Sequence, residues 1–334
     1  MDIRYVVAGS LAREYILPAV GLPMLDVPGG EALYGCGGLL VWEERVGLLA
    51  RVDEGYPRGW LRQLEGQGVD TSGVSILEQP ADVRRFFAYD AHLRVSRGSA
   101  VAQFARRGLP FPKSLLGYRP PEEMTLDQRK ANPLSPSPME MPPSYREALA
   151  AHLCPLDLAS HLQLASAFHA ASTTTLTVDP SASYMIPDSL RSLRPLLAGA
   201  TAFLPSEEEL RSLFWGQTYD LWEMLAAIGT YGCEIVVAKR GREGQAVLDV
   251  LGKHRWEVPA YPARMADPTG AGDAFCGGFL AGLKKTYDPL RAALHGNVAA
   301  SLAIEGTGAL YTLDVAPGLA EARLDALTDL VREV

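Results

Sequence analysis

The sequence has few cysteines, and their spacing matches neither a disulfide framework nor a metal site. The 334 residues contain only Cys36, Cys154, Cys233 and Cys276, and no two of them form a CxxC motif. Scattered single cysteines of this kind are typical of small buried side chains. The six histidines form no HExxH motif and no paired metal spacing. We therefore predict neither a disulfide-stabilised fold nor a zinc centre.

Long apolar runs are absent as well. No stretch approaches the 18 uninterrupted apolar residues that a membrane-spanning helix requires. The N-terminal segment, MDIRYVVAGS, lacks the basic-then-apolar order of a signal peptide. The sequence therefore predicts a cytoplasmic protein without a membrane partner.

Positive charge is in deficit. Lys and Arg together number 31 against 39 for Asp and Glu, and the net charge is -8. This balance argues against a nucleic-acid partner, because such binding depends on a basic surface. It does not exclude an anionic ligand, since a few oriented amides and one cation can hold a phosphate locally.

Three motifs of common enzyme classes are missing. The sequence contains no GxxxxGK[ST] and no GxSxG, which argues against a P-loop NTPase and an α/β-hydrolase. The first apolar run ends in Gly9-Ser10 without a GxGxxG, so an NAD-dependent oxidoreductase has little support.

The chain does contain an alternation of short apolar runs with helical patterns. The runs cover residues 5–8, 46–52, 175–178, 202–204 and 235–238, and the helical patterns cover 60–67, 156–171, 187–194, 207–215 and 219–232. This alternation predicts an α/β fold with a mainly parallel central sheet flanked by helices. Residues 83–89 and 93–95 mix apolar and charged side chains, which favours strands of a sheet with one solvent-facing side.

Proline dominates one segment, residues 108–145. Prolines stand at positions 110, 112, 120, 121, 133, 136, 138, 142 and 143. Such density is incompatible with a helix or a central strand. We expect a long surface excursion with little regular structure, serving either as a lid or interface element or as inert decoration.

The string DPTGAGDAF at residues 267–275 is the most informative part of the chain. Apolar residues follow it at helical spacing, so a helix is expected to begin near Gly272. Gly270 and Gly272 allow a tight turn, and the free amides of a helix N-terminus bind anions. Asp273 in the first turn would then stand beside the anion. It would act as a base toward an attacking hydroxyl, or would simply cap the helix.

The whole string resembles the C-terminal signature of the ribokinase-like, or PfkB, family of carbohydrate and nucleoside kinases. The resemblance implies a single ribokinase-like α/β domain over residues 1–334, with ATP and Mg²⁺ as cofactors. It also implies a small β-sheet lid from segments near 14–34 and 83–97. Because an exposed sheet of this kind needs covering, the lid is also the expected interface of a homodimer. By the same resemblance Gly270, Ala271 and Gly272 form an anion hole and Asp273 is the catalytic base.

Two departures from the family pattern fall in the segment that contacts the sugar. Gly29 and Gly30 resemble the family's paired glycines, but Tyr34 stands where members often carry an Asn. Glu14 stands where members carry a sugar-binding Asp. These four residues are the expected substrate contacts. Alternatively, Tyr34 is a core residue and Glu14 a solvated charge at a strand end.

The resemblance also implies residues for the nucleotide and the metal ions. The expected nucleotide contacts are Lys239, Gly241, Gly244 and Asn297, with Lys239 alternatively ending a strand in solvent. Glu209 keeps the acid of a family NxxE motif whose Asn is here Ser206, and is expected to bind Mg²⁺ through water. It lies at an acidic helix start, where acids are favoured in any case. Asp267 and Thr269 match positions that bind a monovalent cation in some members.

Together these residues predict an ATP-dependent kinase for a hydroxyl of a small sugar, polyol or nucleoside. The alternative is a catalytically weak or inactive nucleotide- or sugar-binding protein of the same fold, because the Asn is missing at positions 34 and 206.

Overall fold

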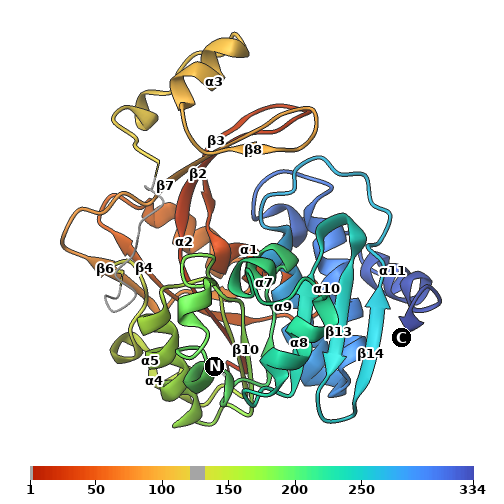
Figure 1. Cartoon of the computed structure of the whole chain (residues 1–334). Coiled ribbons are helices and arrows are strands. Elements are labelled where there is room, and N and C mark those ends of the chain that lie inside the picture. Colours follow the sequence, from red (N-terminus) through yellow and green to blue (C-terminus); the bar gives the residue numbers. More distant parts are fainter. Residues whose placement is uncertain (1–2, 121–131) are drawn as a thin grey trace.

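A computed structural model describes residues 3–120 and 132–334 (Figure 1). Within this part of the chain eleven strands form one sheet, in the order β15-β14-β13-β12-β11-β10-β9-β1-β4-β5, with β6 also paired to β4. From the β5 side the bounds are Val69–Asp70 (β5), Val74–Leu77 (β6), Val46–Asp53 (β4), Tyr5–Ala8 (β1), Ala150–Leu153 (β9), Thr175–Val178 (β10) and Ala202–Phe203 (β11). The remaining strands are β12 (Ile235–Lys239), β13 (Gln245–Asp249), β14 (His254–Val258) and β15 (Arg332–Glu333).

The predicted mainly parallel sheet is confirmed. Every pairing from β5 and β6 across to β12 is parallel, whereas β12 to β15 are antiparallel. In register, Val6 of β1 lies between Gly47 and Ala151 of its two neighbours. The carboxyl ends of β1, β9, β10, β11 and β12 therefore meet at one edge of the sheet.

Helices cover both faces of the sheet, because the central strands are apolar on both sides. One face packs on α5 (Leu158–His169), α6 (Arg194–Leu197), α7 (Glu207–Leu213) and α8 (Leu221–Gly229). The other packs on α1 (Glu31–Leu40), α2 (Arg58–Glu65), α9 (Ala271–Thr286), α10 (Pro289–Ala303) and α11 (Leu319–Thr328). Alternate residues of one strand serve both faces: Val236 joins the first core and Val237 the second.

The helix expected at residues 187–194 is wrong in detail. The structure has a short 3₁₀ turn at Pro187–Ser189, and α6 begins only at Arg194. Pro187 and Pro195 each occupy the first turn of one of these elements, where a missing N–H costs nothing, so two short elements replace one helix.

A small separate sheet stands above the main body (Figure 1). Its order is β3-β2-β7-β8, from β2 (Ala12–Leu17), β3 (Met24–Gly29), β7 (Arg84–Tyr89) and β8 (Val95–Ser96). We call this sheet the lid. Residues 31–34, which the prediction included in the lid, belong to α1 instead. The strand expected at residues 93–95 begins only at Val95, because Leu93 lies in a turn with φ +61°.

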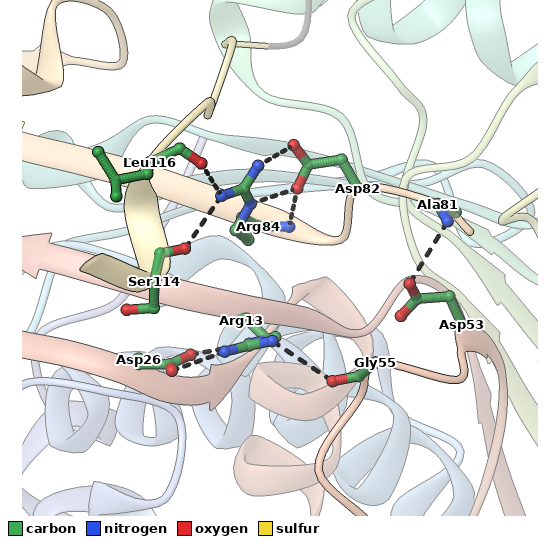
Figure 2. A network of polar contacts seen from close by, with 9 residues as sticks. All are labelled: Arg13, Asp26, Asp53, Gly55, Ala81, Asp82, Arg84, Ser114 and Leu116. Carbon is green, nitrogen blue, oxygen red and sulfur yellow. Dashed lines mark hydrogen bonds and ion pairs between the residues drawn. The ribbon is translucent and has the colours of Figure 1, made fainter. Parts of the chain in front are cut away.

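The chain itself covers one face of the lid. Tyr15 and Phe86 of the lid pack against Phe104 of α3 (Ala100–Arg106) and Leu115 of the short turn η1 (Lys113–Leu115). Figure 2 shows Arg84 of β7 donating to the carbonyl oxygens of Ser114 and Leu116, at 2.9 Å each. This face is therefore shielded within the chain itself, and the expected homodimer through the lid stays a prediction.

The later part of the proline-rich segment is packed against the body. The Tyr145 ring in α4 (Pro143–Arg146) is fully buried, and its hydroxyl accepts from the Leu48 amide at 3.2 Å and donates to the Asp70 carbonyl at 2.7 Å. Residues 121–131 of the predicted excursion lie outside the described residues. The described remainder has little regular structure, as expected, but it is partly buried rather than a surface excursion throughout.

Replacement of Phe104 tests this cover. Phe104 is 1 % exposed, and its ring centroid lies 5.9 Å from that of Phe86 and 5.4 Å from that of Phe111. Phe104→Ala should lower the free energy of unfolding by about 3 kcal/mol because it leaves a cavity. Val101→Ala on the same helix is the matched control, since Val101 is 65 % exposed. Urea denaturation measures both, and equal effects of the two changes would contradict the described cover.

Candidate active site

The loop before α9 places the first turn of this helix beside Lys239, at the end of β12. Within the loop the Ala271 amide donates to the Pro268 carbonyl at 3.2 Å. Gly270 is the N-cap residue of α9, with φ +73°, a conformation that glycine adopts without strain. A Cβ atom at this position would overlap the ring of Tyr34 in α1. The predicted helix start near Gly272 is confirmed to within one residue, since α9 begins at Ala271.

Asp273 lies in the first turn of α9. Burial raises the pKa of its carboxyl well above the ordinary value, and the carboxylates of Glu31 and Asp179 add to this effect. Lys239 and Arg85 act in the opposite direction. A carboxylate with a raised pKa, set among charged groups from four other segments of the chain, is suited to accept a proton.

Lys239 ends β12 and lies beside the same helix start. Its ammonium forms an ion pair with Asp179, the residue that follows β10, and lies 3.6 Å from the Cys276 Sγ. Burial lowers the pKa of Lys239, but Asp179, Cys276 and Glu209 together outweigh burial and the pKa is raised, so the side chain stays charged. A Cβ atom at Gly272 would lie 3.6 Å from the Lys239 Nζ. The predicted alternative of a solvated strand end is wrong, because the side chain is 14 % exposed.

Glu14 of β2 is buried. The predicted alternative, in which Glu14 is a solvated charge at a strand end, is therefore wrong. Glu14 is 1 % exposed, its Oε1 accepts from the Gly30 amide at 2.9 Å, and its Oε2 accepts from the Tyr34 hydroxyl at 2.8 Å. Burial raises the pKa of Glu14 to about 7, against the opposing effect of Arg85. A Cβ atom at Gly29 would overlap the Glu14 side chain, so the first of the paired glycines makes room for this acid.

Three residues that sequence reasoning missed form a cluster beside this pair. Ser10 follows β1, Glu31 opens α1 and Arg85 lies on β7 of the lid. The Arg85 Nη1 lies 2.5 Å from the Glu31 Oε1, and its Nη2 donates to the Ser10 Oγ at 2.8 Å. Ser10 in turn donates to Glu31. Two sequence features could have indicated this cluster. Glu31 directly follows the paired glycines, and Arg85 is a charged residue within a predicted lid strand.

The lid touches the signature loop through Tyr89. The Tyr89 hydroxyl lies 2.8 Å from the Thr269 Oγ1, and Thr269 donates through both its amide and its hydroxyl to the Asp267 Oδ1. The other oxygen of this carboxyl, Oδ2, is buried and has no hydrogen-bond partner among the described residues. Burial raises the pKa of Asp267, and the bonds from Thr269 oppose that shift.

Of the other residues expected at the nucleotide, two lie in a turn and one lies in a helix. Gly241 and Gly244 form the turn between β12 and β13, both with positive φ. Asn297 of α10 is 3 % exposed and is used within the protein. It accepts from the Tyr261 amide and donates to the Gln245 side chain and the Pro259 carbonyl. Asn297 therefore holds the loop at residues 259–261, and its expected contact with a nucleotide stays a prediction.

Glu209 takes part in a helix cap. Its Oε2 accepts from the Ser206 amide and hydroxyl, both at 2.8 Å, and Ser206 is the N-cap residue of α7. Glu209 therefore stabilises the helix start, as the sequence allowed for an acid at this position. Within residues 3–120 and 132–334, no three His, Cys, Asp or Glu side chains converge as a metal-binding group. In the same ranges no helix combines the length and apolar character needed to cross a bilayer.

The fold and this site define a ribokinase-like α/β kinase. Residues 145–316 match the pfkB family of carbohydrate kinases, and the chain belongs to this family. It is 26 % identical over 264 residues to the cytidine kinase of Thermococcus kodakarensis, an alignment that covers 78 % of this chain and 82 % of the relative.

Solved structures of the same fold cover nearly the whole chain. A putative ribokinase II from E. coli in its apo form superimposes with a TM-score of 0.73 at 17 % identity, covering 98 % of this chain and 100 % of that one. A Burkholderia thailandensis nucleoside kinase in complex with inosine gives 0.69 at 16 % identity, with 96 % of each chain covered. These likenesses confirm the predicted fold class and its small separate sheet.

Two glycines of the loop should respond differently to substitution. Gly270→Ala forces a positive φ on alanine and a collision with the Tyr34 ring, so we expect a loss of about 2 kcal/mol or more in unfolding free energy. Gly272→Ala meets only ordinary contact distances and should change stability by about 1 kcal/mol at most. Denaturant titrations of the two variants measure this difference. Equal stability would contradict the placement of Tyr34 against the loop.

The pH dependence of stability should reveal Glu14. Because its folded pKa is raised from 4.5 to about 7, protonation favours the folded state. The stabilisation is complete below about pH 4.5 and is lost as pH rises through 7. It is worth roughly 3 kcal/mol, since one pKa unit corresponds to about 1.4 kcal/mol. Glu14→Gln should lack this loss, whereas exposed Glu44→Gln should keep it. Parallel curves for Glu14→Gln and the unaltered chain, from urea titrations at pH 4.5 to 8, would refute the assignment.

Proposed function

We propose that the protein transfers the γ-phosphoryl group of ATP to a hydroxyl of a small sugar, polyol or nucleoside, with Asp273 as catalytic base. The observation that carries the proposal is the position of Asp273 in the first turn of α9, beside Lys239 and among partly compensated charges. Helix N-terminal amides and a buried cation suit a migrating phosphoryl group, and the carboxylate suits the proton that the acceptor loses.

In the proposed reaction the acceptor oxygen forms a bond to the γ-phosphorus while the bond from that phosphorus to the bridging oxygen of ADP breaks. Asp273 takes the hydroxyl proton. The amides of Gly270, Ala271 and Gly272, with Lys239, stabilise the charge on the transferring group. Positioning and electrostatic stabilisation supply most of the acceleration in reactions of this type.

The proposed cofactors are supported to different degrees. An E. coli putative ribokinase II in complex with ATP and Mg²⁺ superimposes with a TM-score of 0.71. Mg²⁺ keeps several waters and needs only one or two protein carboxylates besides the phosphates, where it neutralises developing charge. The helix cap uses the Glu209 Oε2, so Oε1 is the oxygen that would face a magnesium-bound water.

For a monovalent cation the supporting observation is the Asp267 Oδ2, which is buried without a partner among the described residues. A cation beside it would compensate a buried carboxylate. Thr269, bound to the other oxygen of Asp267, would help to hold the loop around it. We keep the cytoplasm as the proposed compartment, because all four cysteines are buried and free.

A nucleoside is the acceptor best supported by the relatives. The Thermococcus relative is named a cytidine kinase, and the Burkholderia structure holds inosine. A weakly active binding protein is the second candidate. The observation that favours it is the hydrogen bond between Glu14 and Tyr34, which occupies two residues expected to contact the sugar. Calorimetric binding of cytidine without a phosphorylated product by mass spectrometry would support the binding protein over the kinase.

Asp273→Asn tests the proposed base. With ATP and a panel of cytidine, inosine, ribose and fructose, the variant should lose about 10²- to 10⁴-fold in kcat. Asp325→Asn, at an exposed position of α11, is the control and should retain full activity. Because the pKa of Asp273 is raised and only its ionised form accepts a proton, kcat/KM of the unaltered chain should rise with pH through that pKa. Unchanged turnover in Asp273→Asn would refute the assigned base.

A further inference from the structure

We propose that Ser10, Glu31 and Arg85 form the acceptor-recognition site and that they bind the vicinal hydroxyls of a neutral, ribose-like acceptor. This inference rests on the proposed function and adds to it the chemical class of the acceptor. None of the three residues belongs to the signature loop. They come from the end of β1, the start of α1 and the lid strand β7, so only the folded chain brings them together.

The cluster lies near the proposed base and is accessible. The Glu31 carboxylate is the charged group that contributes most to the raised pKa of Asp273, and Arg85 also acts on that pKa. The side chains of Glu31 and Arg85 are 24 % and 29 % exposed, so a ligand can reach both. The backbone places the two together: Glu31 opens α1, and a Cβ atom at Gly35 of the same helix would lie 3.8 Å from the Asp273 carbonyl oxygen. An acceptor held by the cluster would therefore lie beside the first turn of α9, which carries Asp273.

Glu31 and Arg85 offer complementary hydrogen-bonding groups. Burial opposes ionisation of Glu31, but Arg85 and Ser10 outweigh burial and lower its pKa, so the carboxylate is an acceptor. The guanidinium of Arg85 is a donor only. Two adjacent hydroxyls, each of which can donate and accept, match such a pair, and hydrogen bonds to charged groups are the stronger ones.

Glu14 is unsuited to this role, although the sequence favoured it. Both of its oxygens already accept from the Gly30 amide and the Tyr34 hydroxyl, and it is 1 % exposed. Glu31 therefore replaces Glu14 as the acid that meets the acceptor. Glu14 instead acts through Tyr34, whose ring lies against Gly270.

The charges around the cluster disfavour an anionic acceptor. Arg85 is already matched by Glu31, and Lys239 by Asp179. Asp273 then adds a carboxyl without a cation of its own. A sugar acid would bring another carboxylate beside Glu31 and Asp273, where like charges repel at short range. A neutral polyol or ribosyl group avoids this cost.

The test compares acceptors that differ by one hydroxyl. Steady-state kinetics with ATP would use cytidine, inosine and ribose, each beside its 2-deoxy analogue, with fructose and gluconate as further acceptors. The unaltered chain should show a KM about tenfold or more higher for the deoxy analogue. Glu31→Gln and Arg85→Gln should raise KM for the ribosyl acceptor about tenfold, leave kcat within a few-fold, and bring the ribo-to-deoxy ratio near one.

Arg94→Gln is the matched control, because Arg94 forms an exposed ion pair with Asp90 in the same lid and should keep the discrimination. Thermal unfolding of every variant verifies that it folds. The inference is overturned if the unaltered chain does not distinguish the deoxy analogues. It is equally overturned if Glu31→Gln and Arg85→Gln keep the distinction, or if fructose or gluconate is preferred to all ribosyl acceptors.

Calorimetric titration with cytidine and 2′-deoxycytidine separates this inference from the proposed function. One outcome is binding that discriminates between the two compounds and weakens in Glu31→Gln, but without turnover. That outcome would contradict the proposed kinase activity and support the recognition site. Another outcome is turnover in which Glu31→Gln and Arg85→Gln discriminate as well as the unaltered chain does. That outcome would contradict the recognition site and support the kinase activity. Neither binding nor turnover with any compound of the panel would overturn both.

Discussion

The site depends on one constraint, the close approach of α1 and α9. Glycines make it possible: a Cβ atom at Gly277 would overlap the Gly35 carbonyl, and one at Gly38 would overlap the Ala274 carbonyl. Because the two backbones touch, the start of α9 is held against the start of α1. The loop at residues 267–270, Asp273 and Glu31 are therefore fixed in one place, which is the preorganisation that the proposed phosphoryl transfer would require.

Most charged side chains buried near this contact belong to ion pairs. Lys239 with Asp179, and Arg85 with Glu31, each join an element of the sheet or lid to a neighbouring segment. Ionised groups are tolerated there because each has an opposite charge and further hydrogen bonds. Among the described residues Asp273 forms no such ion pair, and burial together with the carboxylates of Glu31 and Asp179 raises its pKa well above the ordinary value. The lid adds Arg85 from above and is itself stabilised by α3 and η1 of the same chain.

Much of this architecture could be predicted from the sequence. Apolar runs alternating with helical patterns predicted the parallel sheet, and the nine-residue string at 267–275 predicted both a helix start and a family. Side-chain partners could not be predicted, because they depend on which distant segments meet. Glu14 was expected to contact substrate or solvent, yet it is enclosed by Tyr34. The hydrogen bond of Asn297 to the Tyr261 backbone could not be predicted either, because it joins α10 to a loop far away in the sequence. A proline-rich segment carries no periodicity from which to infer that it packs on the lid.

The most direct measurement of the central claim is a crystal structure with a non-hydrolysable ATP analogue and cytidine bound together. The account predicts the γ-phosphate on the amides of residues 270–272. It also predicts an acceptor hydroxyl about 3 Å from the Asp273 carboxylate, a hydrogen-bond distance that permits proton transfer. A γ-phosphate bound away from that loop, or an acceptor whose hydroxyls all point away from Asp273, would contradict it.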